Sequence, residues 1–124
     1  MSHFTEIRTQ IKDIAALRSA CAEMGLPVMP NDNARGYAGN SHKGEFVIRL
    51  KGPYDIAVNK NPDGNYGLTT DWWDGHVARE VGKDYGKLLQ LYGVHKAMAE
   101  ARKRGHTVTR RQLDNGAVKL VIGG

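Results

Sequence analysis

A predicted β-hairpin constrains the fold of this chain most strongly. Its two strands, 54–60 and 65–71, alternate in polarity and flank the turn Asn61-Pro62-Asp63-Gly64. Proline presets φ in such a turn and glycine accepts a positive φ, so the pattern predicts two antiparallel strands. The second strand runs into Asp71-Trp72-Trp73-Asp74. Both tryptophans of the chain therefore lie at one strand end, between two carboxylates.

The length of 124 residues fits a single domain that spans residues 1–124 and buries roughly two thirds of its unfolded surface. One cysteine, Cys21, excludes an internal disulfide framework and fits a reducing compartment. Because it lies on an apolar helical stripe, we expect a buried thiol. The chain has no signal peptide pattern and no run near the ~20 apolar residues of a membrane span. We expect a soluble protein without membrane attachment, in the cytoplasm, or in the plastid stroma if a plastid encodes it.

Hydrophobic periodicity predicts two helices and five further strands or strand candidates around the hairpin. Helical spacing follows two capping candidates, Asp13 and Asp84, and the second helix reaches about Arg104. Alternation predicts strands at 3–11, 44–51, 106–113 and 117–122, with a weaker candidate at 34–38. The resulting order is β-α-β-β-β-β-α-β-β. Strands joined by tight turns pair antiparallel, so the sequence predicts an α+β fold, a single curved sheet with both helices on one face.

A strand, a helix and a hairpin occur in each half of the chain. This order resembles the pseudo-duplicated, TATA-binding-protein-like arrangement of curved sheets. Residues 75–82 are expected to form a linker or a short helical turn. Gly93, inside the second helix, is expected to contact a strand or loop closely, and Gly36 and Gly39 to mark a bulge or a close backbone approach. His95 is expected to be a core histidine bonded to a backbone carbonyl or a tyrosine.

The positive charge of the chain is concentrated in residues 83–111. The whole chain carries a net charge of +5, and this segment alone has eight cations and two carboxylates, 8 − 2 = +6. The cations are Lys83, Lys87, Lys96, Arg102, Lys103, Arg104, Arg110 and Arg111. Such a patch binds polyanions or an acidic protein face, or it only keeps the domain soluble.

The two tryptophans should point to opposite faces of their strand. One is then a core residue, and the other is an exposed ring that would stack a base or anchor a peptide beside Tyr37, Tyr54 or Tyr66. Asp71, Asp74 and His76 resemble a metal or acid-base group only weakly and are more typical of turn formers. We predict no catalytic set, metal or cofactor. The candidate interaction surface comprises Arg35, Tyr37, Asp71, Trp72, Trp73, Lys96, Arg102, Lys103, Arg104, Arg110 and Arg111.

Several motifs together resemble one uncharacterised family. They are the opening MSHF with its isoleucine-rich strand, Arg35-Gly36-Tyr37 followed by Gly39, the block 44–50, Tyr54-Asp55-Ile56 with Asn59-Lys60, Asp71-Trp72-Trp73, Tyr92 with His95-Lys96, and the closing strand at Ile122. The family is a conserved chloroplast reading frame of algal plastids, photosynthetic and other bacteria, and it is a domain of unknown function. The similarity covers essentially the whole chain, with a departure at residues 75–82.

The resemblance implies no established reaction. Genes of the family often lie near those of a small companion protein, a ferredoxin and an AAA-type ATPase, which implies an accessory protein of a larger system. We therefore expect a non-enzymatic accessory or adaptor module that binds a protein partner. The alternative is a nucleic-acid-binding protein that uses residues 83–111 and the strand end at Trp72-Trp73. An enzyme is the least favoured of the three functions. Homodimerisation through the short apolar last strand is a further alternative.

Overall fold

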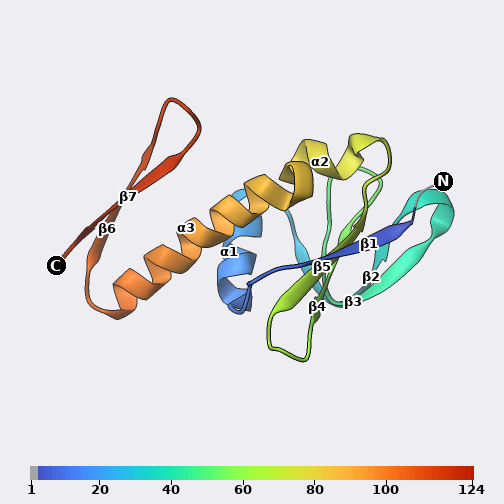
Figure 1. Cartoon of the computed structure of the whole chain (residues 1–124), viewed down its shortest axis with the longest axis horizontal. Helices are drawn as coiled ribbons and strands as arrows, with labels where there is room; N and C mark the ends of the chain where they lie inside the picture. The colour runs from blue at the N-terminus through green and yellow to red at the C-terminus, as the bar shows by residue number, and fades with distance from the viewer. Residues whose placement is uncertain (1–2) are drawn as a thin grey trace.

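The computed structural model describes residues 3–124 and contains two long helices, seven strands and a short helix in the range 75–82 where a linker or helical turn was expected (Figure 1). The weaker strand candidate at 34–38 is displaced, because the strand covers Val28–Arg35 and Tyr37–Gly39 form a 3₁₀ turn. The helices and strands are β1 (Phe4–Arg8), α1 (Ile14–Glu23), β2 (Val28–Arg35), β3 (Ser41–Ile48), β4 (Ile56–Lys60), β5 (Tyr66–Asp71), α2 (His76–Val81), α3 (Gly86–Lys103), β6 (Thr107–Gln112) and β7 (Val118–Gly123). None of the helices within residues 3–124 combines the length and the apolar character needed to cross a bilayer.

The first five strands form one antiparallel sheet in the order β1-β5-β4-β3-β2. The predicted hairpin is its centre, because β4 and β5 pair from Ala57 opposite Thr69 to Lys60 opposite Tyr66. The first strand then adds to the outer side of β5, with Ile7 opposite Leu68. The α+β class and the antiparallel sheet are confirmed.

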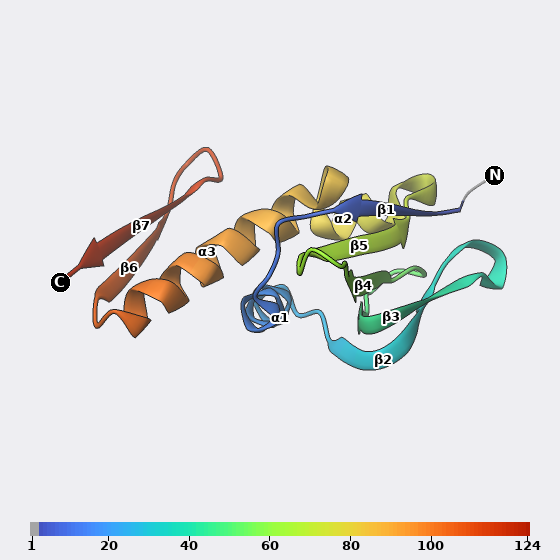
Figure 2. The same cartoon turned by 60° about the horizontal axis from the view of Figure 1, so that its bottom comes forward.

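The last two strands do not join this sheet, contrary to the expectation of a single sheet. They form a separate two-stranded hairpin, in which Val108 lies opposite Ile122. The 18 residues of α3 span about 27 Å at 1.5 Å per residue and carry the chain beyond the sheet before β6 begins (Figures 1 and 2). A duplicated arrangement would need the second hairpin to continue the sheet, so the pseudo-duplicated expectation is wrong.

Helices α1 and α3 pack against each other and cover the same face of the sheet (Figure 2). Their apolar residues share one core with Ile48, Ile56 and Leu68 of the sheet. The predicted cap is present, since the side chain of Asp13 accepts a hydrogen bond from the Ala16 amide at 3.0 Å. Cys21 is fully buried, and burial raises the pKa of its thiol to about 12, which confirms the expectation of a buried cysteine.

The opposite face of the sheet is also partly closed, because the sheet curls. Ala34, Val47 and Ala57 are fully buried on this face, and Phe4 packs against them. A Cβ at Gly36 would lie 2.6 Å from the ring of Phe4, so the tip of the β2-β3 hairpin crosses over the start of β1. The close approach at Gly36 comes from a side chain, the Phe4 ring, and not from the backbone that was expected, and a Cβ at Gly39 would meet nothing within 4 Å. The alternation in 44–51 had grouped Val47 with Arg49 and Lys51, away from the main core.

The segment between β5 and α3 forms more of the core than the sequence indicated. Val77 and Val81 of α2 are fully buried, as is Tyr85, which adopts a left-handed conformation with φ 66°. The ring of Tyr85 packs on Trp72 at a centroid separation of 4.8 Å. Asp84 also has a positive φ and does not cap α3, so that predicted cap is wrong.

Candidate functional site

One buried carboxylate fixes two exposed aromatic residues at the end of β5. Asp71 is 1% exposed. Its Oδ1 accepts the backbone N–H of Trp73 at 3.0 Å, and its Oδ2 accepts the backbone N–H of Tyr37 at 3.2 Å. The two rings then meet edge-on, with centroids 5.8 Å apart. A single side chain of the central hairpin thus joins two turns that are distant in sequence.

The backbone on the C-terminal side of each ring is strained in the same way. Tyr37 and Trp73 each begin a 3₁₀ turn, Tyr37–Gly39 and Trp73–Gly75. The next residue in each turn has a left-handed conformation, φ 55° at Ala38 and φ 57° at Asp74. This region costs a residue with a side chain on the order of 1 kcal/mol or more, and it persists where the surroundings impose it. The aromatic pair is therefore held in a defined orientation.

The two tryptophans divide between core and surface as predicted. Trp72 packs against the main core and Tyr85. Trp73 is 47% exposed and Tyr37 is 42% exposed. Tyr54 and Tyr66, the other proposed neighbours of an exposed tryptophan, are buried. Tyr37 and Trp73 together form what we call the aromatic pair.

Arg35 has a structural partner at the neighbouring end of β4. Its Nε and Nη2 donate to the two carboxylate oxygens of Asp55, each at 2.8 Å, and Arg49 Nη1 donates to the same carboxylate at 2.7 Å. Asp55 is fully buried. Burial alone would raise the pKa of Asp55, but the hydrogen bonds from Arg35 and from backbone amides hold it below its ordinary value. Arg35 thus neutralises a buried charge and supports the loop that carries Tyr37.

Two of the predicted surface cations are also bound within the fold. Arg110 of β6 donates from both terminal nitrogens to Glu23 of α1, at 2.7 and 2.8 Å. Lys96 of α3 donates to Asp13 at 3.3 Å and to Glu100 at 3.1 Å. The first contact ties the hairpin to α1, and the second ties α3 to the cap of α1.

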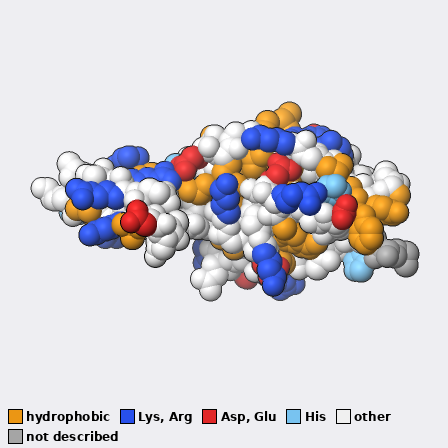
Figure 3. Space-filling view, turned by 90° about the horizontal axis from the view of Figure 1, so that it is seen from above, with side chains coloured by type: hydrophobic (Ala, Val, Ile, Leu, Met, Phe, Trp, Pro, Cys, Tyr) orange, Lys and Arg blue, Asp and Glu red, His pale blue; other side chains and the backbone are white. Residues whose placement is uncertain are grey.

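The remaining predicted cations lie at the far end of α3 and on the hairpin. Lys103 has a loose contact of 3.9 Å to Glu100. For Arg102, Arg104 and Arg111, no carboxylate of residues 3–124 lies within salt-bridge distance. In the space-filling view, Lys and Arg side chains lie both at the hairpin end and over the middle of the molecule, and apolar side chains gather at the opposite end (Figure 3). The cations at the far end of α3 and on the hairpin lie at the other end of the molecule from the strand end at Trp73 (Figure 1), although the sequence had suggested that they act together.

His95 binds a carboxylate instead of the backbone carbonyl or tyrosine that was expected. Its Nε2 lies 2.8 Å from Oε1 of Glu23, the residue that also accepts from Arg110. The hydrogen bond from Arg110 lowers the pKa of Glu23 most, burial opposes this, and His95 lowers it further, to about 2. Glu23 is thus a junction between α1, α3 and the hairpin.

Asp71, Asp74 and His76, the weak candidate for a metal site, make contacts within the fold. The Asp71 carboxylate is taken by two backbone amides, and His76 lies 3.8 Å from Asp74 and 3.0 Å from Arg79. Across residues 3–124, no three side chains of His, Cys, Asp or Glu are grouped as metal ligands would be.

These features describe a small α+β protein with a curved antiparallel sheet and a fixed, exposed aromatic pair. The chain belongs to the family described as "Protein of unknown function (DUF1257)", which matches residues 20–121. It is 30% identical over 126 residues to an "Uncharacterized protein ycf35" of Pyropia yezoensis, across 98% of this chain and 96% of the relative. It is 28% identical over 124 residues to the protein of the same name from Guillardia theta, with the same coverage. No solved structure matches the chain.

These matches confirm the resemblance to a conserved plastid reading-frame family. They extend over nearly the full length of both relatives. The names of the two relatives state no activity, so the function has to be inferred from the residues of this chain.

Proposed function

We propose that the protein is a non-enzymatic adaptor that binds a protein partner through the aromatic pair, Tyr37 and Trp73. The observation that carries the proposal is that one buried carboxylate, Asp71, fixes both exposed rings. Tyrosine and tryptophan supply large contact areas at low entropic cost and dominate protein interfaces. Rings that are already oriented lose little further freedom on binding.

The charge around the aromatic pair fits this function. Arg35 is engaged by Asp55, and Asp71 is shielded by backbone amides. The neighbouring residues Asp74 and His76 contribute a mixed rim at the side of Trp73. A surface with an aromatic centre and a polar rim is typical of a protein-docking site.

Partner capture from a native extract tests the proposal. The immobilised full chain is compared with Trp73→Ala and with the matched surface variant Lys103→Ala/Arg104→Ala, after nuclease treatment of the extract. We expect Trp73→Ala to lose the captured protein and the double variant to retain it. Capture that survives Trp73→Ala and fails with the double variant would contradict the aromatic anchor and favour a charged one.

Nucleic-acid binding is the second candidate, since Arg102, Arg104 and Arg111 have no bound carboxylate within the described chain. Phosphate contacts make affinity fall steeply as salt rises. Titration of the full chain with a generic single-stranded oligonucleotide at low and high salt tests this function. Absence of binding even at low salt eliminates it.

A homodimer formed through β7 is the remaining partner alternative. Val121 and Ile122 of this strand are 44% and 51% exposed, and an edge strand pairs readily with another chain. Elution volume at two protein concentrations tests it. For the location, we propose the cytoplasm, or the plastid stroma if a plastid encodes the chain; the plastid reading-frame name of the algal relatives supports the second.

A further inference from the structure

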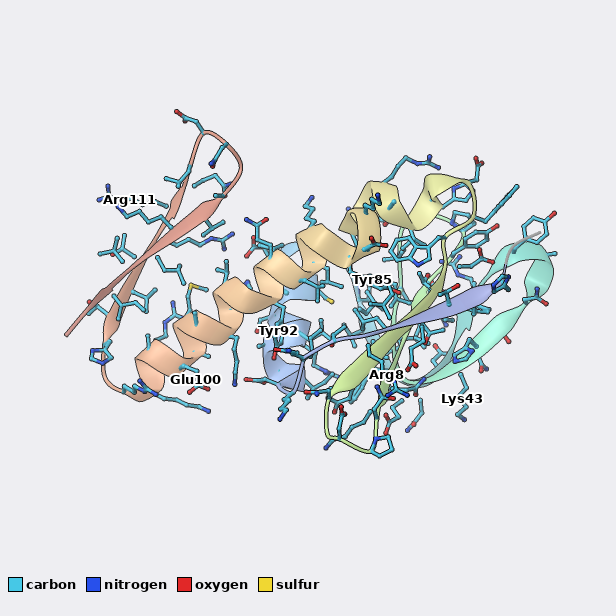
Figure 4. The ribbon with its side chains drawn as sticks, viewed as in Figure 1. Arg8, Lys43, Tyr85, Tyr92, Glu100 and Arg111 are labelled. Atoms are coloured by element: carbon cyan, nitrogen blue, oxygen red, sulfur yellow. The ribbon has the colours of Figure 1, made fainter. Side chains whose placement is uncertain are left out.

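A mainly apolar pocket lies between the edge strand β1 and helix α3. Its volume is about 440 Å³. The apolar side chains of its wall are Ile7 and Ile11 from the β1 side and Leu89 and Tyr92 from α3. Arg8 and Lys96 are the charged residues that line it within residues 3–124; Arg8 follows Ile7 in β1, so its side chain points to the other face of the sheet. Figure 4 shows Tyr92 on α3 and Arg8 at the end of β1.

The strand beside this pocket has unused backbone hydrogen-bonding groups. Thr9 donates its N–H to the carbonyl of Tyr66 at 3.3 Å. In an antiparallel pair, hydrogen-bonded residues alternate with those that point away. Thr5 and Ile7 therefore pair with β5 in the same way as Thr9, because the register is continuous. The N–H and C=O groups of Phe4, Glu6 and Arg8 consequently face the free edge of the sheet.

The two edges of the sheet differ in their protection. The other edge strand, β2, contains Pro30, which lacks an N–H, and Asn31, which has φ 47°. Both features discourage the addition of another strand. The five residues of β1 contain neither a proline nor a left-handed residue. Of the two edges of the five-stranded sheet in residues 3–124, the one that borders the pocket is thus the more open to strand addition.

The pocket and the edge together specify the chemistry of an occupant. A strand added to β1 would place alternate side chains on the two faces of the sheet. One side chain would enter the pocket beside Ile7 and Leu89 and should be apolar. Its immediate neighbours would lie on the opposite face, near Arg8, whose side chain is 74% exposed. Arg8 makes a loose contact of 3.8 Å to Glu6, so its exposed guanidinium can still pair with an acidic neighbour, whereas Lys96 is already bound by Asp13 and Glu100 at 3.3 and 3.1 Å.

We infer that β1 binds an extended peptide segment of the protein partner as a sixth strand, with an apolar side chain in the pocket and an adjacent acidic residue at Arg8. This inference rests on the proposed protein-binding function and names the form in which the partner binds. The aromatic pair lies beyond the start of the same strand, since Phe4 is opposite Asp71. One partner can therefore contact both sites.

Selection of short linear peptides from a phage-displayed random library on the full chain tests the inference. A selected peptide is then titrated by fluorescence anisotropy against four variants. Glu6→Pro removes an edge N–H that β5 does not use, and Glu6→Ala is its control. Leu89→Ser alters the pocket wall, and Leu120→Ser alters a partly buried leucine on the distant hairpin. Cooperative urea unfolding of each variant establishes that it is folded.

We expect the selected peptides to share an apolar residue next to an aspartate or glutamate. Glu6→Pro and Leu89→Ser should weaken binding about tenfold or more, while Glu6→Ala and Leu120→Ser change it by about twofold or less. An absence of binding peptides, or equal affinity for Glu6→Pro and Glu6→Ala, would overturn the inference. Failure of the aromatic-anchor proposal can be distinguished from failure of the strand-addition proposal. Loss of partner capture with Trp73→Ala but not with Glu6→Pro leaves the aromatic anchor standing and eliminates strand addition, and the reverse result eliminates the anchor.

Discussion

The ring of Trp73 meets the ring of Tyr37 edge-on at a centroid distance of 5.8 Å. The two residues belong to separate turns, and the carboxylate of Asp71 binds the backbone of both. The backbone of both exposed residues is consequently tied to the buried end of β5. Because Asp71 is buried and the two rings are exposed, substitutions can test the contribution of each residue to stability separately from its contribution to partner binding.

The two tryptophans should differ in their contribution to stability. Trp73→Ala is expected to change the free energy of unfolding by about 1 kcal/mol or less, because it removes an exposed ring with one aromatic contact. Trp72→Ala is expected to cost about 3 kcal/mol or more, because it leaves a cavity beside Tyr85. Urea denaturation monitored by circular dichroism measures both. Equal losses would mean that Trp73 is a core residue.

Asp71→Ala should both destabilise the protein and release the aromatic pair. Two partly buried backbone N–H groups, of Tyr37 and Trp73, lose their acceptor, which costs about 2 kcal/mol in total. The near-ultraviolet circular dichroism of the folded variant should weaken as the rings lose their fixed orientation. Asp74→Asn is the matched control, since asparagine tolerates the left-handed backbone of that position. Retention of the near-ultraviolet signal in Asp71→Ala would show that the rings are fixed by other contacts.

Gly93→Ala should stabilise the protein. Gly93 lies inside α3, and a Cβ there would meet no atom within 4 Å, so alanine gains about 0.5–1 kcal/mol of helix propensity. Gly36→Ala gives the opposite expectation, because its Cβ would collide with the ring of Phe4. Thermal and urea unfolding measure both variants. If Gly93→Ala destabilised the protein, Gly93 would instead be in close contact with a neighbouring segment, as the sequence had suggested.

The attachment of the hairpin to α1 should depend on pH. The ordinary pKa of a glutamate, 4.5, is lowered to about 2 at Glu23, chiefly by the hydrogen bond from Arg110. A carboxylate with a lowered pKa contributes stability that is complete above its unfolded value and is lost as the pH falls through its folded value. The contact should therefore weaken between pH 4.5 and about pH 2.

Amide hydrogen exchange of β6 and β7 across this interval measures the weakening, and Glu23→Gln is the control. The variant cannot titrate at this position, so its hairpin protection should be lower at neutral pH and should vary less on acidification. Protection of the native hairpin that stays constant down to pH 2 would show that Glu23 does not hold it.

Local signals in the sequence predicted the elements well. The turn Asn61-Pro62-Asp63-Gly64 located the central hairpin, and Asp13 located the start of α1. These features depend on residues that are neighbours in the chain, so spacing and turn chemistry suffice to find them. The division between a core and an exposed tryptophan was also predicted, but it arises for a different reason: the strand ends at Asp71, and the 3₁₀ turn that begins at Trp73, not strand alternation, separates the two rings.

Features that depend on tertiary contacts were not visible in the sequence. The left-handed backbone at Asp84 and Tyr85 turned an expected helix cap into a buried turn. The curl of the sheet buried Val47, which alternation had grouped with Arg49 and Lys51. The link between Tyr37 and Trp73 depends on the folded position of Asp71, and pattern reasoning had considered Asp71 only as a weak ligand or turn former. The sequence signal that could have indicated it was an aspartate at the end of a predicted strand, directly before a pair of tryptophans.

Site-specific photo-crosslinking tests the central claim most directly. A benzophenone amino acid replaces Trp73 in one sample and Lys103 in another, and each full chain is irradiated in a nuclease-treated native extract. The aromatic-anchor proposal predicts a discrete crosslinked protein from position 73, removed by excess unlabelled native chain, and no such product from position 103. A competable product from position 103 alone, or crosslinks to nucleic acid when nuclease is omitted and to no protein at position 73, would contradict it.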